Sequence, residues 1–115
     1  MRYMLLIYTP ESDPTPIPED EYLQRYSALT QEMRDTGAFL GGDPLEFTDS
    51  STTIRVRDGK TLTTDGPFAE TKEQLGGYYI VEAKDLDEAT AWAAKIPGAL
   101  HGSIEVRPIR EFGGT

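Results

Sequence analysis

The chain has 115 residues, with 11 basic and 20 acidic side chains that give a formal net charge of −9, and it contains no cysteine. This length fits one domain spanning residues 1 to 115, which can bury a core without disulfides or metal. The lack of cysteine excludes thiolate catalysis and cysteine zinc sites and favours a cytoplasmic location. Negative charge disfavours nucleic-acid binding, and the apolar run at residues 3 to 8 is too short to span a membrane.

Residues 2 to 8 predict a strand that is apolar on both faces. One face carries Tyr3, Leu5 and Ile7, and the other carries Met4, Leu6 and Tyr8. A strand with one face in water alternates apolar and polar residues, so we expect that something covers the second face. In a small single domain the simplest cover is another subunit, which predicts a homodimer.

A proline-rich segment, residues 9 to 18, separates this strand from a predicted helix. It is typical of a semi-extended loop, which either arches over a cleft or only connects the two elements. The helix begins after Pro18 with three acids that oppose the helix dipole, and it ends at Gly37. Its apolar stripe, which we interpret as core, is Tyr22, Tyr26, Leu29 and Met33.

Residues 39 to 47 predict a second strand, in which Gly41-Gly42 indicate a bulge or a close approach by another group. Residues 53 to 56 and 61 to 64 flank Asp58-Gly59, a strong hairpin signal. Alternation places three of the eleven bases on one hairpin face, namely Arg55, Arg57 and Lys60. This face is either a solvated charge cluster or an anion-attracting patch, and on the second interpretation Arg55 and Arg57 bind ligand.

Residues 65 to 77 form a turn-rich run, Asp65-Gly66-Pro67-Phe68-Ala69-Glu70-Thr71-Lys72-Glu73-Gln74-Leu75-Gly76-Gly77. Asp-Gly, proline and paired glycines indicate that the backbone geometry is closely specified here. The run is either a plain hairpin exit or the rim of a site.

Residues 78 to 83 predict a third sheet strand, and residues 85 to 96 predict a second helix that Pro97-Gly98 terminates. Residues 103 to 109 predict a last strand, and residues 110 to 115 predict a loose tail. The order β-α-β-hairpin-β-α-β is a split βαβ pattern of the α+β class, with both helices on one sheet face.

Three stretches carry a family resemblance: residues 2 to 8, residues 65 to 77 and residues 101 to 108. Together they resemble the YCII-related proteins, in the branch named for its DGPF motif. The resemblance implies a ferredoxin-like domain that pairs into a dimeric α/β barrel. The frequent position of the branch beside genes for extracytoplasmic-function sigma factors implies a regulatory partnership as an alternative function.

The resemblance does not supply a catalytic dyad. Some members are thought to use a histidine on the first helix and an aspartate near the end of the second, but residues 19 to 36 contain no histidine and Lys95-Ile96-Pro97 offers no aspartate. The positions carried over by motif are Asp65, Gly66, Pro67, Phe68, Glu70, Lys72, Glu73 and His101, with roles that the family leaves open.

His101 is the only histidine, at a predicted loop, and is either a structural hydrogen-bonding group or a general acid–base. We predict a catalytic set of His101, Glu70 and Asp65. The predicted ligand site is a polar cleft on the helix-free sheet face, lined by Tyr8, Tyr78, Glu82 and Arg107 with Phe68, Lys72 and Glu73 from the loop. No metal-ligand or cofactor motif is present, so we expect neither. The leading hypothesis is a homodimer that binds a small polar or anionic molecule, with acid–base catalysis left open.

Overall fold

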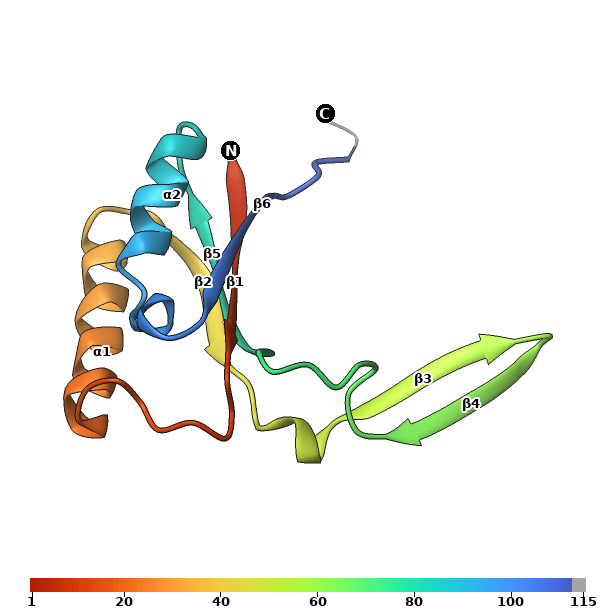
Figure 1. Cartoon of the computed structure of the whole chain (residues 1–115). Coiled ribbons are helices and arrows are strands. Elements are labelled where there is room, and N and C mark those ends of the chain that lie inside the picture. The colour runs from red at the N-terminus through yellow and green to blue at the C-terminus, as the bar shows by residue number, and fades with distance from the viewer. Residues whose placement is uncertain (113–115) are drawn as a thin grey trace.

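The computed structural model describes residues 1 to 112 and contains a four-stranded sheet, a two-stranded hairpin and two α-helices (Figure 1). The sheet strands are β1 (Arg2–Thr9), β2 (Phe39–Pro44), β5 (Gln74–Glu82) and β6 (Ser103–Pro108). The hairpin strands are β3 (Thr52–Arg57) and β4 (Lys60–Asp65). The helices are α1 (Glu19–Asp35) and α2 (Leu86–Ala94), with 3₁₀ turns η1 (Thr48–Ser50) and η2 (Pro97–Leu100).

The sheet has the strand order β2-β5-β1-β6, and every neighbouring pair is antiparallel. Two βαβ units, β1-α1-β2 and β5-α2-β6, interlock in this order, and both helices cover the same face (Figure 1). The predicted split βαβ, ferredoxin-like arrangement is therefore confirmed within one chain.

The core lies between the helices and the covered sheet face. Leu5 and Val81 on the two central strands are fully buried, and they share the core with Met33 of α1 and Ala89 of α2. The buried set is completed by Tyr3, Ile7, Leu29, Ala38, Tyr79, Ala83, Ala93 and Ile96. No polar or charged residue within 1–112 is fully buried, so apolar burial is the main source of stability.

The opposite sheet face has no cover from residues 1 to 112, and we refer to it as the open face. Register places Leu6 beside Tyr78 and Glu105, and Met4 beside Ile80 and Arg107, all on this face. These apolar side chains are only half-buried. The predicted contrast between the two faces of β1 is thus present, with Tyr3, Leu5 and Ile7 on the buried side.

The glycines near the sheet edge have different tasks. A register shift between Phe39 and Gly41 confirms the predicted bulge in β2. Gly76 and Gly77 were expected to precede a strand beginning at Tyr78, but β5 begins at Gln74 and includes both. A Cβ on Gly77 would lie 3.1 Å from the Asp43 carbonyl oxygen, so this glycine allows close approach of β2 rather than forming a turn.

The second helix is capped as its sequence predicts, but it ends earlier. The Asp85 carboxylate accepts from the Glu88 backbone N–H at 2.9 Å, and the Glu88 carboxylate accepts from the Lys84 N–H. Helical structure ends at Ala94, and η2 begins at Pro97, which lacks the N–H needed to continue the helix. In the tail, Ile109–Phe112 has no regular structure, and residues 113 to 115 lie outside the described residues.

The hairpin β3–β4, residues 52 to 65, projects from the body as an arm (Figure 1). The Cα radius of gyration is 16.2 Å, whereas a compact chain of this length has about 13 Å. Asp58 and Gly59 have φ values of 52° and 74°, as a tight two-residue turn requires. Arg57 pairs directly with Lys60, which confirms the predicted register and the grouping of the bases on one face.

The junction between η2 and β6 gives a first prediction. A Cβ at Gly102 would collide with the carbonyl oxygen of Tyr8, and backbone atoms of a central strand cannot yield. We expect Gly102→Ala to lower the free energy of unfolding by about 3 kcal/mol in urea titrations. Gly41→Ala is the control, because its Cβ would meet only Ile80 Cδ1 at 3.9 Å. Equal unfolding midpoints for the two variants would contradict this account of the junction.

Candidate functional site

A cavity of about 650 Å³ opens between α1 and the β2–β5 edge of the sheet, on the helix-covered side. Several hydroxyl-bearing residues line it, among them Tyr22, Tyr26 and Thr30 of α1 and Tyr79 of β5. We call it the tyrosine pocket. The apolar part of its lining consists mainly of Leu23, Phe39, Leu45 and Phe47. Arg34, whose guanidinium lies 4.2 Å from the centre of the Phe39 ring, adds one positive charge to the lining.

The hydroxyl groups on α1 follow its periodicity. Tyr22, Tyr26 and Thr30 are four residues apart and therefore share one helix face. The sequence places Tyr22 and Tyr26 in the same stripe as Leu29 and Met33, which we interpreted as core. Leu29 and Met33 are buried and Tyr26 packs partly buried against the core, so the prediction is confirmed for these three, but Tyr22 and Tyr26 also line the pocket. The repeated hydroxyl group was the signal that could have revealed the site.

Hydrogen bonds fix which hydroxyl protons face a ligand. Thr30 Oγ1 donates to the Tyr26 carbonyl at 2.9 Å, so in its 2.8 Å contact with the Tyr79 hydroxyl it accepts. The Tyr26 hydroxyl accepts from the Gly98 N–H at 3.2 Å, which leaves its own proton free to donate. The Tyr26 hydroxyl is therefore a hydrogen-bond donor that a ligand in the pocket can use.

Burial keeps these phenols neutral. Desolvation raises the pKa of Tyr22 above 10.0. Desolvation also raises the pKa of Tyr26 strongly, with the electrostatic influence of Tyr22 second, and it raises the pKa of Tyr79. At neutral pH the pocket consequently presents hydroxyl groups rather than phenolates.

His101 lies directly behind the tyrosine pocket. Its Nε2 is 2.9 Å from the Tyr22 hydroxyl, the two rings are edge to face, and its Nδ1 is buried without a partner. We assign the Nε2–H tautomer, because a bare buried nitrogen is less costly than a buried N–H with no acceptor. His101 then donates to Tyr22, and the Tyr22 proton is free to reach a ligand.

The predicted ligand residues on the open face are engaged within the chain. The Tyr8 hydroxyl donates to Glu105 at 3.4 Å, and Arg107 forms an ion pair with Glu105 at 3.0 Å. Glu82 pairs with the N-terminal amine at 3.0 Å, at the other end of the sheet from Tyr8. Tyr78 donates to Asp43 at 3.1 Å and is the member of this set that also lines the tyrosine pocket.

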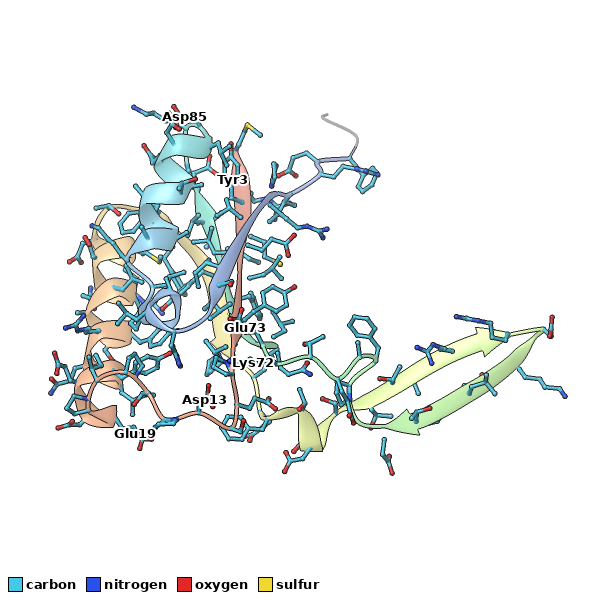
Figure 2. All side chains as sticks on the ribbon, in the orientation of Figure 1. Tyr3, Asp13, Glu19, Lys72, Glu73 and Asp85 are labelled. Carbon is cyan, nitrogen blue, oxygen red and sulfur yellow. The ribbon has the colours of Figure 1, made fainter. Side chains whose placement is uncertain are left out.

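The turn-rich run of residues 65 to 77 contains an ordered loop, residues 66 to 73, between β4 and β5. Gly66 has φ 103°, which favours glycine, and the Gln74 side-chain amide donates to the carbonyls of Ala69 and Thr71. The Glu73 carboxylate accepts from the Ser103 hydroxyl at 2.8 Å, which ties the loop to β6. Figure 2 shows Lys72 and Glu73 near the end of the sheet from which the arm departs.

The predicted catalytic residues do not converge. Asp65 pairs with Thr52 at the base of the arm, and Glu70 is exposed in the loop. Within residues 1 to 112 no hydrogen bond or ion pair joins either carboxylate to His101, whose side-chain partner is Tyr22. Phe68 is 79% exposed, and Arg55 and Arg57 lie on the arm, away from the pocket lining.

Metal-binding clusters and membrane-spanning helices are both absent from the described part of the chain. No group of three or more His, Asp or Glu side chains there is arranged to hold a metal ion. Among the helices of residues 1 to 112, none has the length and apolar character needed to cross a membrane.

Comparison with known proteins gave matches over almost the whole chain. Residues 1 to 113 match the model of the YCII-related domain family. The uncharacterized protein R00369 of Rhizobium meliloti is 39% identical over 114 residues, which covers 95% of this chain and 92% of that protein. The solved structure of 5-chloro-2-hydroxyhydroquinone dehydrochlorinase (TftG) from Burkholderia phenoliruptrix, in complex with 2,5-dihydroxybenzoquinone, covers 96% of this chain and 94% of its own at 16% identity and a TM-score of 0.48.

The raised tyrosine pKa values predict a loss of stability at alkaline pH. Above the ordinary pKa of 10.0 the unfolded chain releases phenol protons that the folded chain retains, so the free energy of unfolding falls as pH rises. We expect urea titrations to show this decline from about pH 10. Tyr26→Phe should lower the free energy of unfolding by about 1 kcal/mol at neutral pH, because the Gly98 N–H loses its acceptor. The free energy of unfolding of this variant should then decline less steeply in alkali than that of the wild type. Identical slopes would contradict the assignment to Tyr26.

Proposed function

The chain belongs to the YCII-related domain family, and we propose that it is a homodimeric protein that binds a small polar or anionic molecule in the tyrosine pocket. The observation that carries this proposal is the pocket itself. It combines a volume of about 650 Å³ with convergent hydroxyl groups and apolar walls, which is the usual composition of a small-molecule site.

The lining defines the kind of ligand. Free protons on Tyr22 and Tyr26 suit an oxygen acceptor such as a carbonyl or carboxylate, because neutral phenols donate strongly in a poorly hydrated site. Phe39 and Phe47 offer apolar surface for the body of the molecule, and the lining holds one positive side chain, Arg34, and one negative side chain, Asp43. The ligand is thus a compact molecule with an apolar part and at least one acceptor oxygen.

Acid–base chemistry in the pocket falls to Tyr22 and His101. Tyr22 lines the cavity and touches the ligand, whereas the His101 Nε2–H donates to the Tyr22 hydroxyl oxygen and stabilises that oxygen when its proton passes to the ligand. Glu70 and Asp65, the other predicted catalytic residues, lie elsewhere in the chain, so this proposal assigns them no role.

The open face supports the homodimer. Met4, Leu6 and Ile80 form a half-exposed apolar strip across the central strands, and Leu40 beside them is 49% exposed. Contiguous apolar surface of this kind marks association sites in proteins. Two copies that meet through their open faces form the dimeric α/β barrel proposed for this chain.

Two finer assignments belong to the same proposal. The run Asp65-Gly66-Pro67-Phe68 supports placement in the DGPF branch of the family, and the cysteine-free composition supports a cytoplasmic location. The sigma-factor partnership has no support in the family match or the relatives, and it is not proposed.

The pocket is tested by a ligand screen. We expect at least one compound from a panel of small carbonyl and carboxylate compounds to raise the melting temperature, by about 10 °C at a concentration one hundred times its dissociation constant. Tyr22→Phe and Tyr26→Phe should each lower the affinity for that compound about tenfold, because each removes one hydroxyl donor. Calorimetric titration gives the affinities.

Tyr8→Phe is the matched control, since it removes a hydroxyl group from the open face and leaves the pocket intact. Loss of binding in Tyr8→Phe, with Tyr22→Phe unaffected, would move the site to the predicted cleft on the open face. No thermal response to any compound of the panel would contradict small-molecule binding.

The homodimer gives a separate prediction. Light scattering at micromolar protein concentration should give twice the chain mass of 12.8 kDa. Leu6→Glu places a charge in the middle of the open face and should yield a folded monomer, because an unpaired charge is costly in a dry interface. A wild-type protein that is monomeric at every accessible concentration would contradict the dimer.

A further inference from the structure

The arm of residues 52 to 65 makes almost no contact with the body of its own chain. Every residue of β3 and β4 is exposed apart from the half-buried Thr53, near the base of the arm. The base is fixed by two hydrogen bonds, from the Gly66 N–H to the Ser51 carbonyl and from the Thr53 hydroxyl to the Gly66 carbonyl. An isolated two-stranded hairpin is marginally stable in water, so a regular arm of this length calls for a partner surface.

One face of the arm is suited to burial. Cross-strand register brings Ile54 beside Thr63 and Val56 beside Thr61 on the same face. Ile54 is 55% exposed and Val56 is 60% exposed, although β-branched side chains of this kind favour a packed sheet surface. This face therefore has the composition of an interface that the single chain leaves uncovered.

The position of the arm identifies its partner as a second copy of the chain. The helices lie on one side of the sheet, and the arm projects on the other side, the side of the open face (Figure 1). A copy seated on the open face consequently lies within reach of the arm. The arm alone offers about 200 Å² per face, from a length of about 20 Å and a width of about 10 Å, whereas a stable dimer buries about 800 Å² per partner. Arm and open face therefore serve one interface.

Charge decides what the arm touches on that copy. Residues 52 to 65 hold three basic and two acidic side chains, whereas the rest of the chain holds eight basic and eighteen acidic ones. Two arms paired edge to edge would bring Arg55, Arg57 and Lys60 close to their own copies, which is unfavourable. These bases lie on the arm face opposite Ile54 and Val56 and stay outside the interface, but the acidic body of the partner attracts the arm as a whole.

From these observations we propose that in the homodimer each arm clasps the body of the partner, with Ile54 and Val56 in the interface. This inference rests on the proposed dimer but not on ligand binding. The dimer then has three contact regions: the paired open faces at the centre and one arm on each side, related by twofold symmetry.

The test is the double variant Ile54→Asp and Val56→Asp, analysed by sedimentation over a range of concentrations. Loss of two buried side chains should raise the dimer dissociation constant at least about 100-fold while circular dichroism stays native. Leu86→Asp is the control, because Leu86 is 54% exposed on α2, among the helices, and should leave the constant unchanged. If the double variant dimerises as tightly as the wild type, the proposed role of the arm is overturned but the dimer is not. If the wild type is monomeric, both the dimer and the role of the arm are overturned.

A second measurement does not depend on how far the double variant weakens the dimer. A photo-crosslinking residue in place of Val56 should join the arm to the body of the partner, within residues 1 to 51 or 66 to 112, as read from peptides of mixed isotope-labelled protein. Crosslinks confined to residues 52 to 65 of the partner, or an absence of crosslinks between chains in a sample shown to be dimeric, would overturn the clasp.

Discussion

The structure depends on one imbalance: β1 is apolar on both faces, and the chain supplies helices for only one of them. On the covered face Leu5 is fully buried, and each such side chain contributes about 2 kcal/mol. On the other face Leu6 and Met4 stay half-exposed between β5 and β6. The imbalance separates the two proposed tasks in space. The tyrosine pocket, proposed for small-molecule binding, lies on the helix side, and the surface proposed for association lies on the open side, toward which the arm extends.

The tyrosine pocket follows from the way α1 meets the sheet. Leu29 and Met33, in the second half of the helix, reach the core and hold the helix down. Tyr22 and Tyr26, in the first half, cannot sink into the same apolar layer without losing partners for their hydroxyl groups. Gly98 and His101 supply such partners at the rim of the core, so the first half of α1 remains apart from β2 and a cavity stays open.

Much of the fold could be predicted from local patterns. Periodicity located both helices, and Asp58-Gly59 fixed the hairpin register because both residues adopt positive φ. The start of β5 was missed because Gly76-Gly77 are typical of a turn. Here they serve a close approach between strands, which depends on the position of Asp43, more than thirty residues away in sequence. Such a contact leaves no local signal.

The candidate site was less accessible from sequence than the fold. The prediction of a cleft on the open face rested on charged side chains there that needed partners. The structure supplies those partners within the chain, since Glu105 pairs with Arg107 and Glu82 with the terminal amine, and exposed pairs of this kind cost little. Tyr79 and His101 join the α1 hydroxyl groups only through sheet register and the η2 turn, so their role could not be predicted from spacing.

The bases of the arm also limit how it can associate. Both outer edges of a free hairpin present unpaired backbone groups that could add further strands and lead to aggregation. Arg55, Arg57 and Lys60 oppose the approach of another arm, because like charges facing one another across strands repel. The acidic remainder of the chain is not repelled in this way. The same three residues that make the arm the basic part of an acidic protein therefore disfavour an open chain of hairpins and favour the closed dimer that we propose.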